Sequence, residues 1–468
     1  MAREVAAEAR RFGRTAGLLS VGIGSAGLLT YVYFSLASHI LDKVDYGEVV
    51  VLWSAVFVTI STLFRPVEQL LSRTIAERQA RGQPIGQPLR VAATIQLGLA
   101  VAFGGAALAL RQPLQDQLLS GSEALYWILV TAVLAFGASF FARGFLAGSR
   151  RFALYAGLLL AESTARVSFA VAVAVGIASG QTAVALGIVA APLLSLTVVP
   201  LAFAHRAAAQ SRATARAVAR SRAAPAPSVP AARRSEFTLA AGGSFAAAVL
   251  LIMISEQCLL NAGPLLVRAS EGAAAAGFIF NVLMIARAPL VLFQAVATSL
   301  LPHLTRLRSS GKEEDAEAFR LSIRATVGAI AAFAAAVGLV VLIAGPQLMQ
   351  LAFGKKFSYD RVGLEIVTVG MGFYLSSGAL NQAALAQGQV RRAAACWLGC
   401  ALAFIGWNVL PVLDEFRRVE VGFAGAAALL SGLLYLLYRR PRVRPEDVVQ
   451  PGSPQELEAQ LAAADEAS

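Results

Sequence analysis

Arginine-rich breaks fall at every second gap between the helix-length apolar runs of this chain. Of the 40 Lys and Arg residues, 28 lie in these alternate breaks, 8 lie in the intervening breaks and 4 lie inside apolar runs. The cytoplasmic loops of membrane proteins collect Lys and Arg, whereas the outer loops lack them. The alternation therefore predicts a chain that crosses a membrane many times, with both termini in the cytoplasm.

The composition also favours a membrane protein. Hydrophobic residues make up 57% of the chain and charged residues only 15%, which is more apolar than a soluble domain of this length. The formal net charge of +12 is spread over short loops without interleaved aromatic residues, so it favours anionic lipid headgroups over nucleic acid as a partner. The Cys and His residues lack metal-ligand spacing, and we expect neither a metal nor a cofactor.

A membrane-spanning helix needs about 20 apolar residues, and the chain holds about twelve such runs. The predicted fold class is therefore an all-α polytopic membrane protein. The expected spans begin near Thr15, Glu48, Val91, Ala124, Ala153, Gln181, Phe237, Ala273, Leu321, Val362, Ala393 and Val421.

The two halves of the chain resemble each other in the same orientation. Gly148 to Arg151 closes the fourth span and resembles Gly388 to Arg391, which closes the tenth. An Arg followed closely by a Pro occurs in the second and the eighth span, as Arg65-Pro66 and Arg287-Ala-Pro289. Transporters are often built from internal repeats. These echoes predict two six-helix lobes related by a parallel repeat.

Composition sets the expected domain boundaries. Residues 1–205 form the predicted N-terminal lobe and residues 237–440 the C-terminal lobe. Residues 206–236 hold seven Arg with several Pro and Ala, which suits a cytoplasmic linker. Residues 441–468 are polar and become acidic near the end, so we expect a disordered cytoplasmic tail.

Polar side chains recur along one face of the second span. Ser54, Ser61, Arg65, Glu68 and Ser72 follow one another at steps of 7, 4, 3 and 4, which places them on one helical stripe. Ionisable groups inside a span cost at least ~2.5 kcal/mol near its centre, so they usually face a cavity or a partner. We predict that Ser61, Arg65 and Glu68 line a substrate cavity. The alternative is a self-neutralised Arg65 and Glu68 pair at the membrane boundary.

The fifth span carries Glu162 and Arg166 one helical turn apart. This spacing favours a structural i,i+4 ion pair, with ion coupling as the alternative role. Arg143, near the end of the fourth span, is expected to extend its side chain toward the headgroups.

Arg287 lies near the middle of the eighth span and has no acidic residue one turn away, while Gln294 follows on the same face. We predict that Arg287 and Gln294 bind an anionic group. The alternative is an inter-helix salt bridge from Arg287 to Glu256 in the seventh span, and Glu256 is also a candidate for ion coupling.

Several of these features together resemble the Wzx-like polysaccharide flippases of the multidrug/oligosaccharidyl-lipid/polysaccharide exporter superfamily. They are the two six-span halves, Tyr46-Gly47 at the start of the second span, the Gly-x-x-Arg stops at Gly148 and Gly388, and the Arg-bearing second and eighth spans. The resemblance covers essentially the whole chain. One departure is the first span, which has Ser20 and Ser25 where the lipid II flippase carries additional arginines.

The resemblance implies an alternating-access transporter in the bacterial plasma membrane. Its cargo would be an undecaprenyl-diphosphate-linked oligosaccharide, a surface polysaccharide precursor, moved from the inner to the outer leaflet. Arg65 and Arg287 would hold the diphosphate. Glycosyltransferases or a polymerase of a polysaccharide pathway would be its partners.

Two other functions remain open. A cation-coupled drug antiporter of the same superfamily would be expected to favour buried acids over unpaired arginines. A membrane glycosyltransferase or polymerase would handle the same lipid-linked sugars, but these enzymes generally need a larger outer loop and a catalytic acid or base. We find neither in the sequence and expect no enzyme.

Overall fold

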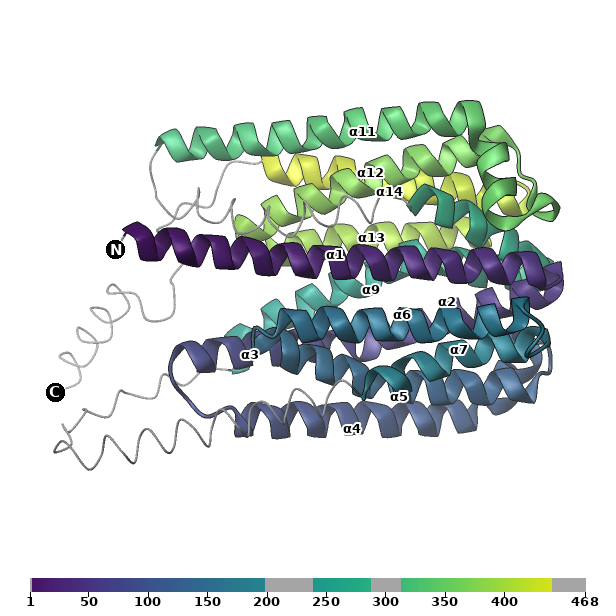
Figure 1. The fold of residues 1–468 in the computed structure, drawn as a ribbon. Helices are drawn as coiled ribbons and strands as arrows, with labels where there is room; N and C mark the ends of the chain where they lie inside the picture. The colour runs from purple at the N-terminus through teal and green to yellow at the C-terminus, as the bar shows by residue number, and fades with distance from the viewer. Residues whose placement is uncertain (1, 198–238, 288–312, 440–468) are drawn as a thin grey trace, which may run out of the picture.

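The computed structural model describes residues 2–197, 239–287 and 313–439, and every regular element in these ranges is a helix. Figure 1 shows that the helices lie side by side along one long axis. Ten helical segments in these ranges are long and apolar enough to cross a membrane, and two shorter apolar helices, Gly180–Ser195 and Ala273–Arg287, lie where the other two spans were predicted. The all-α polytopic prediction is confirmed. The predicted linker 206–236 and tail 441–468 lie outside the described residues.

Residues 2–197, the described part of the first half, contain seven α-helices and one π-helical turn. They are α1 (Ala2–Ile40), α2 (Lys43–Leu63), α3 (Arg65–Ala80), α4 (Gly86–Ala109), η1 (Pro113–Leu118), α5 (Glu123–Gly148), α6 (Phe152–Ala174) and α7 (Gly180–Ser195). The second half contains α9 (Leu239–Glu271), the segment Ala273–Arg287, α11 (Glu313–Phe353), η2 (Lys355–Phe357), α12 (Arg361–Ala386), α13 (Val390–Val409) and α14 (Glu415–Arg439).

Helix packing repeats between the two halves. In the first half α1 packs on α6, α6 on α7, α5 on α7 and α4 on α5. Six spans later α9 packs on α13, α13 on α14, α12 on α14 and α11 on α12. The third and ninth spans, α4 and α11, are also equally peripheral, with only 17% of each apolar window buried. The same neighbours in the same order give two six-helix lobes, as the parallel repeat predicts.

The second span is interrupted between α2 and α3. Pro66 lies in the first turn of α3 and Phe64 separates the two helices. Proline lacks the N–H that would continue the helical ladder, so the break falls beside Arg65, the first residue of α3. The two helices still form one candidate span, Lys43–Gln79, as the sequence predicted. The structure adds that Arg65 lies at the break within it.

Side-chain caps define several helix starts at one end of the bundle. The Asp42 carboxylate accepts hydrogen bonds from the backbone N–H groups of Val44 and Asp45, each at 2.8 Å. Ser122 caps α5 and Asp360 caps α12 in the same way. Such caps satisfy N–H groups that a helix leaves without partners at its start.

The two lobes meet at this same end, which we call the sealed end and define by residues 31–47, 268–281 and 352–357. The Tyr46 hydroxyl donates a hydrogen bond to the Asn281 side chain, and the Lys356 ammonium donates to the Leu41 carbonyl. The rings of Phe34 and Phe280 lie 4.5 Å apart. These contacts close the space between the lobes at the sealed end.

Gly47 allows the closest backbone approach of the lobes. A Cβ atom at this position would collide with the Ala273 carbonyl, which is backbone and cannot rotate away. Arg268 adds a second bridge, because its guanidinium donates to the Leu118 carbonyl at 3.3 Å and to the Ser120 hydroxyl at 2.8 Å.

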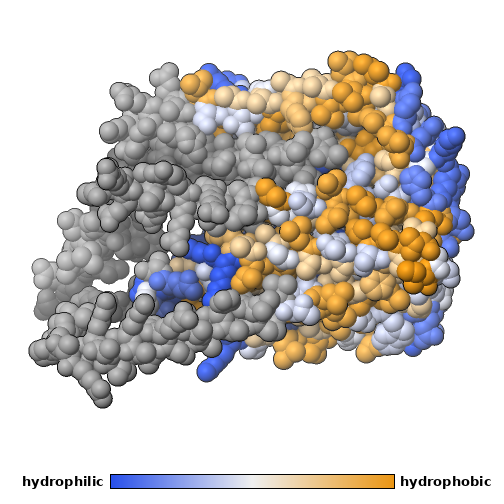
Figure 2. Space-filling model, viewed as in Figure 1, coloured by the Kyte–Doolittle hydropathy of each residue, from blue (hydrophilic) through white to orange (hydrophobic). Residues whose placement is uncertain are grey.

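The outer surface has the pattern of a membrane protein. Figure 2 shows a broad apolar band across the visible face, with hydrophilic residues gathered at the right-hand end of the view. Large apolar side chains such as Leu97, Val101 and Leu339 are about 60% exposed or more, which in water would be unfavourable. Lipid contact accounts for this exposure.

Candidate functional site

A cleft of about 370 Å³ lies beside α3, away from the sealed end. Helices α3, α5 and α6 supply its walls. Its lining residues are Arg65, Glu68, Gln69, Ser72, Arg73, Ala76, Ala147 and Tyr155. Most of these side chains are polar or charged, so the cleft is suited to a polar group that enters from the end of the bundle.

The predicted polar stripe of the second span reaches this cleft only in part. Arg65, Glu68 and Ser72 line it, whereas Ser54 is fully buried and Ser61 is 4% exposed. Helix α2 is enclosed by α5, α7 and α9, so its serines face protein. Ser61, predicted to contact substrate, therefore lies in packed protein outside the cleft lining.

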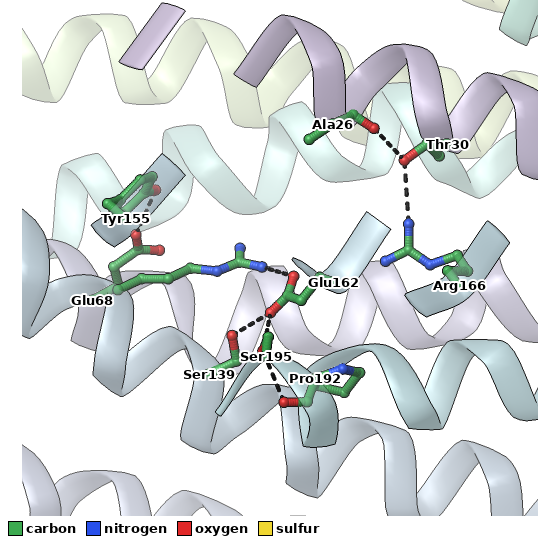
Figure 3. A network of polar contacts seen from close by, with 10 residues as sticks. Ala26, Thr30, Glu68, Ser139, Tyr155, Glu162, Arg166, Pro192 and Ser195 are labelled. Carbon is green, nitrogen blue, oxygen red and sulfur yellow. Dashed lines mark hydrogen bonds and ion pairs between the residues drawn. The ribbon is translucent and has the colours of Figure 1, made fainter. Parts of the chain in front are cut away.

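Arg65 has no ion pair or hydrogen bond within the described residues. The alternative interpretation, an i,i+3 pair with Glu68, is wrong, because the Glu68 carboxylate instead accepts a hydrogen bond from the Tyr155 hydroxyl at 3.1 Å. Figure 3 shows this contact between α3 and α6. The cleft therefore presents one guanidinium whose charge no carboxylate neutralises by direct contact.

Glu162 lies at the centre of a buried polar network (Figure 3). Its carboxylate is 3% exposed and forms a salt bridge with Arg143 of α5. It also accepts hydrogen bonds from the Ser139 hydroxyl and, at 3.2 Å, from the Ser195 hydroxyl. Both sequence interpretations were wrong here: Glu162 pairs across helices rather than with Arg166, and Arg143 is buried rather than extended toward headgroups.

Arg166 uses aromatic and hydroxyl partners. Its guanidinium carbon lies 4.4 Å from the centre of the Trp53 ring, and Nη1 donates to the Thr30 hydroxyl at 3.2 Å. A cation over an indole face is attracted by the ring quadrupole. Arg166 therefore ties α6 to α1 and α2 instead of neutralising Glu162 by direct contact.

Arg287 ends the described part of the eighth span. Its Nη1 donates to the Asn261 side-chain carbonyl at 3.3 Å, while its Nε and Nη2 are buried without a hydrogen-bond partner. The alternative salt bridge to Glu256 does not form, because Glu256 accepts a hydrogen bond from the Tyr374 hydroxyl at 3.2 Å. Gln294, the predicted companion of Arg287, lies outside the described residues.

Arg65 and Arg287, the two predicted anion-binding residues, belong to opposite lobes: Arg65 begins α3 and Arg287 ends the helix Ala273–Arg287.

Sequence reasoning missed Tyr155 and Tyr374, assigned Arg143 to the wrong surroundings, and did not place Asn261 beside Arg287. The two tyrosines carry no spacing signal, because they reach acids on other helices. Asn261 offered a local signal, since it follows Gln257 by four residues on α9 and the two amides are hydrogen-bonded at 2.8 Å. A polar i,i+4 pair inside an apolar span indicates a face turned to another polar group.

Comparison with solved structures identifies the fold of this chain. No family model matches the sequence, and no curated protein matches it. Among solved structures, the chain is similar to an inward-facing multidrug resistance MATE family transporter of the MOP superfamily, with a TM-score of 0.63, 13% identity, and 91% and 93% of the two chains covered. The chain has the MATE transporter fold.

Two further structures agree. The eukaryotic MATE transporter AtDTX14 gives a TM-score of 0.59 at 14% identity, covering 92% of this chain and 95% of that one. The Vibrio cholerae MATE transporter VcmN gives 0.56 at 15% identity, covering 91% and 96%. The predicted two-lobed architecture is confirmed over nearly the whole chain. Identities this low establish the architecture and leave the cargo to be argued from the site.

Proposed function

We propose that this protein is an alternating-access transporter that flips an undecaprenyl-diphosphate-linked oligosaccharide from the inner to the outer leaflet of a bacterial plasma membrane. The MATE-like fold supports a transporter, and the polar cleft supports a cargo with a charged or sugar-bearing headgroup. The prenyl chain would stay in the lipid. Only the headgroup, which hydrocarbon excludes, needs shelter.

The observation that carries this proposal is that two arginines lack a carboxylate partner in the described residues. Arg65 borders the cleft and Arg287 keeps two buried nitrogens without hydrogen-bond partners. Neither has a carboxylate partner in the described part of the chain. An unneutralised buried guanidinium is costly, and its planar donors match phosphate oxygens. A diphosphate between the lobes would satisfy both groups.

The conformation fits the first step of this cycle. The lobes are sealed at one end, and the cleft lies toward the other, where the arginine-rich breaks fall. If that end faces the cytoplasm, as the charge distribution predicts, the cleft is accessible to a headgroup made on the cytoplasmic side. Glycosyltransferases that assemble such a headgroup, and a polymerase that uses it, are the expected partners.

A cation-coupled drug antiporter is the second candidate. The solved structures similar to this chain include a multidrug resistance transporter, and Glu68 places one carboxylate in the cleft. This function predicts that the acid is essential and the arginines are dispensable. A membrane glycosyltransferase or polymerase draws no support from the fold.

The test compares both cargo classes in proteoliposomes. Purified protein is reconstituted with a short-chain prenyl-diphosphate oligosaccharide, and outer-leaflet appearance is measured by glycosidase accessibility. We expect Arg65→Ala and Arg287→Ala each to lower transport roughly 10- to 100-fold, because each removes a charge-assisted contact worth about 1.5–3 kcal/mol. Efflux of a lipophilic cation is measured in parallel.

Matched controls keep the result interpretable. Arg90→Ala and Arg324→Ala remove exposed arginines from the same two lobes and should leave transport unchanged. Glu68→Gln tests the antiporter. Transport of the prenyl-diphosphate substrate by the two arginine variants at the wild-type rate would refute the proposal, and loss of cation efflux in Glu68→Gln alone would establish the second candidate.

A further inference from the structure

Arg287 is held by a chain of two neutral amides. The guanidinium donates to the Asn261 carbonyl oxygen at 3.3 Å, and the Asn261 amide nitrogen donates to the Gln257 carbonyl oxygen at 2.8 Å. Asn261 and Gln257 are both 6% exposed and lie one turn apart on α9. Because the Asn261 amide nitrogen is bonded to Gln257, the carbonyl oxygen of the same amide faces Arg287.

The acid next to Gln257 on α9 has a different partner. Glu256 lies next to Gln257 on α9, yet its carboxylate accepts from Tyr374 of α12. Within the described residues, Arg287 therefore has one neutral hydrogen-bond partner and no carboxylate partner, and its Nε and Nη2 are buried without a hydrogen bond. Asp has nearly the same shape as Asn but would neutralise the arginine.

We propose that Asn261 is a specificity-determining residue: its neutral amide positions Arg287 without neutralising it and so selects cargo with an anionic, phosphate-bearing headgroup. The inference rests on the proposed function, because it explains how the anion site of that transporter keeps its charge. Gln257 supports Asn261 by fixing the orientation of its amide. A single acid at position 261 would form the salt bridge that the native sequence avoids.

The experiment measures binding of farnesyl diphosphate, as a soluble prenyl diphosphate, and of tetraphenylphosphonium, as a lipophilic cation, to the purified full-length protein. We expect Asn261→Asp to weaken farnesyl diphosphate binding roughly 10- to 100-fold, because a carboxylate within about 4 Å of the guanidinium cancels most of its field. Cation binding should stay equal or become tighter. Asn261→Ala keeps the charge of Arg287 and should weaken anion binding by about 5-fold or less.

A second acid variant protects the test against misfolding. Gln257→Glu retains the acceptor for the Asn261 amide, but its new charge is separated from Arg287 by Asn261. An intermediate loss of anion binding is therefore expected. Asn381→Asp is the matched control, because Asn381 is a buried amide of the same lobe whose side-chain carbonyl accepts a hydrogen bond from the Trp397 indole N–H at 3.2 Å. It should bind farnesyl diphosphate as the wild type does.

The outcomes separate the two proposals. If Arg287→Ala weakens farnesyl diphosphate binding while Asn261→Asp and Gln257→Glu, folded by gel filtration and thermal unfolding, bind as the wild type does, the role of Asn261 is refuted and the proposed function stands. If Asn261→Ala is as damaging as Asn261→Asp, the hydrogen bond matters rather than neutrality, and the inference fails. Unchanged binding in Arg287→Ala would overturn both.

Discussion

The buried salt bridge between Glu162 and Arg143 gives the sharpest stability prediction. The Glu162 side chain is 3% exposed and that of Arg143 is 12% exposed, so neither charge is well solvated. Removing one partner of a buried pair leaves the other uncompensated, which costs about 3–5 kcal/mol. Glu162→Ala also deprives Ser139 and Ser195 of their acceptor, whereas Glu162→Gln removes the charge and keeps an oxygen for them.

The expected free energies form a double-mutant cycle. Glu162→Ala, Glu162→Leu and Arg143→Met should each lower the free energy of unfolding by about 3–5 kcal/mol, and Glu162→Gln by about 3 kcal/mol. The double variant Glu162→Leu/Arg143→Met should lie within about 1.5 kcal/mol of the wild type, because replacing both charges by apolar groups is often neutral or stabilising. The cycle measures the coupling between the two groups directly.

The assay is equilibrium unfolding in mixed micelles titrated with dodecyl sulfate, followed by tryptophan fluorescence. Glu77→Ala is the matched control, because its i,i+4 salt bridge with Arg73 is exposed and should contribute about 0–1 kcal/mol. Additive losses in the double variant, or a loss under about 1 kcal/mol in Glu162→Ala, would contradict the account of Glu162 as the counter-charge of Arg143.

Two other predictions concern helix contacts and pH. Gly144→Ala would place a Cβ 2.8 Å from the backbone carbonyl of Glu68, so we expect a loss of about 1–3 kcal/mol in the same unfolding assay. Gly157→Ala, which meets nothing within 4 Å, should be neutral or slightly stabilising. At the sealed end, burial lowers the pKa of Lys356 from its ordinary value of 10.5, Asp42 opposes this and Lys43 adds to it. The unfolded chain then binds more protons between the lowered pKa and 10.5, so the stability of the wild type relative to Lys356→Met should rise with pH across that window. A flat difference across the window would contradict this assignment.

The architecture could be predicted from the sequence because it depends on features that repeat along the whole chain. The alternation of Arg-rich breaks and the lengths of the apolar runs predicted where the apolar helices lie, and the Arg-bearing second and eighth spans marked the two halves. These signals are properties of single helices and of chain topology. They do not depend on which helix faces which neighbour.

The partners of the buried charges were not predictable by the same means. Local spacing favoured Glu162 with Arg166 and Arg65 with Glu68, since i,i+3 and i,i+4 neighbours are the pairs a single helix offers. In the structure Glu162 finds Arg143 and Glu68 finds Tyr155 on other helices. Inside a membrane, tertiary packing decides which donors come within reach, and one-helix reasoning cannot supply that information.

Contact between the lobes is concentrated around the sealed end, where Tyr46, Lys356 and Arg268 bridge them. Two of these bridges end on main-chain oxygens, those of Leu41 and Leu118. In the proposed transporter, opening at the sealed end would break these few hydrogen bonds. Substitution of the side chains at positions 41 and 118 would leave both main-chain acceptors in place.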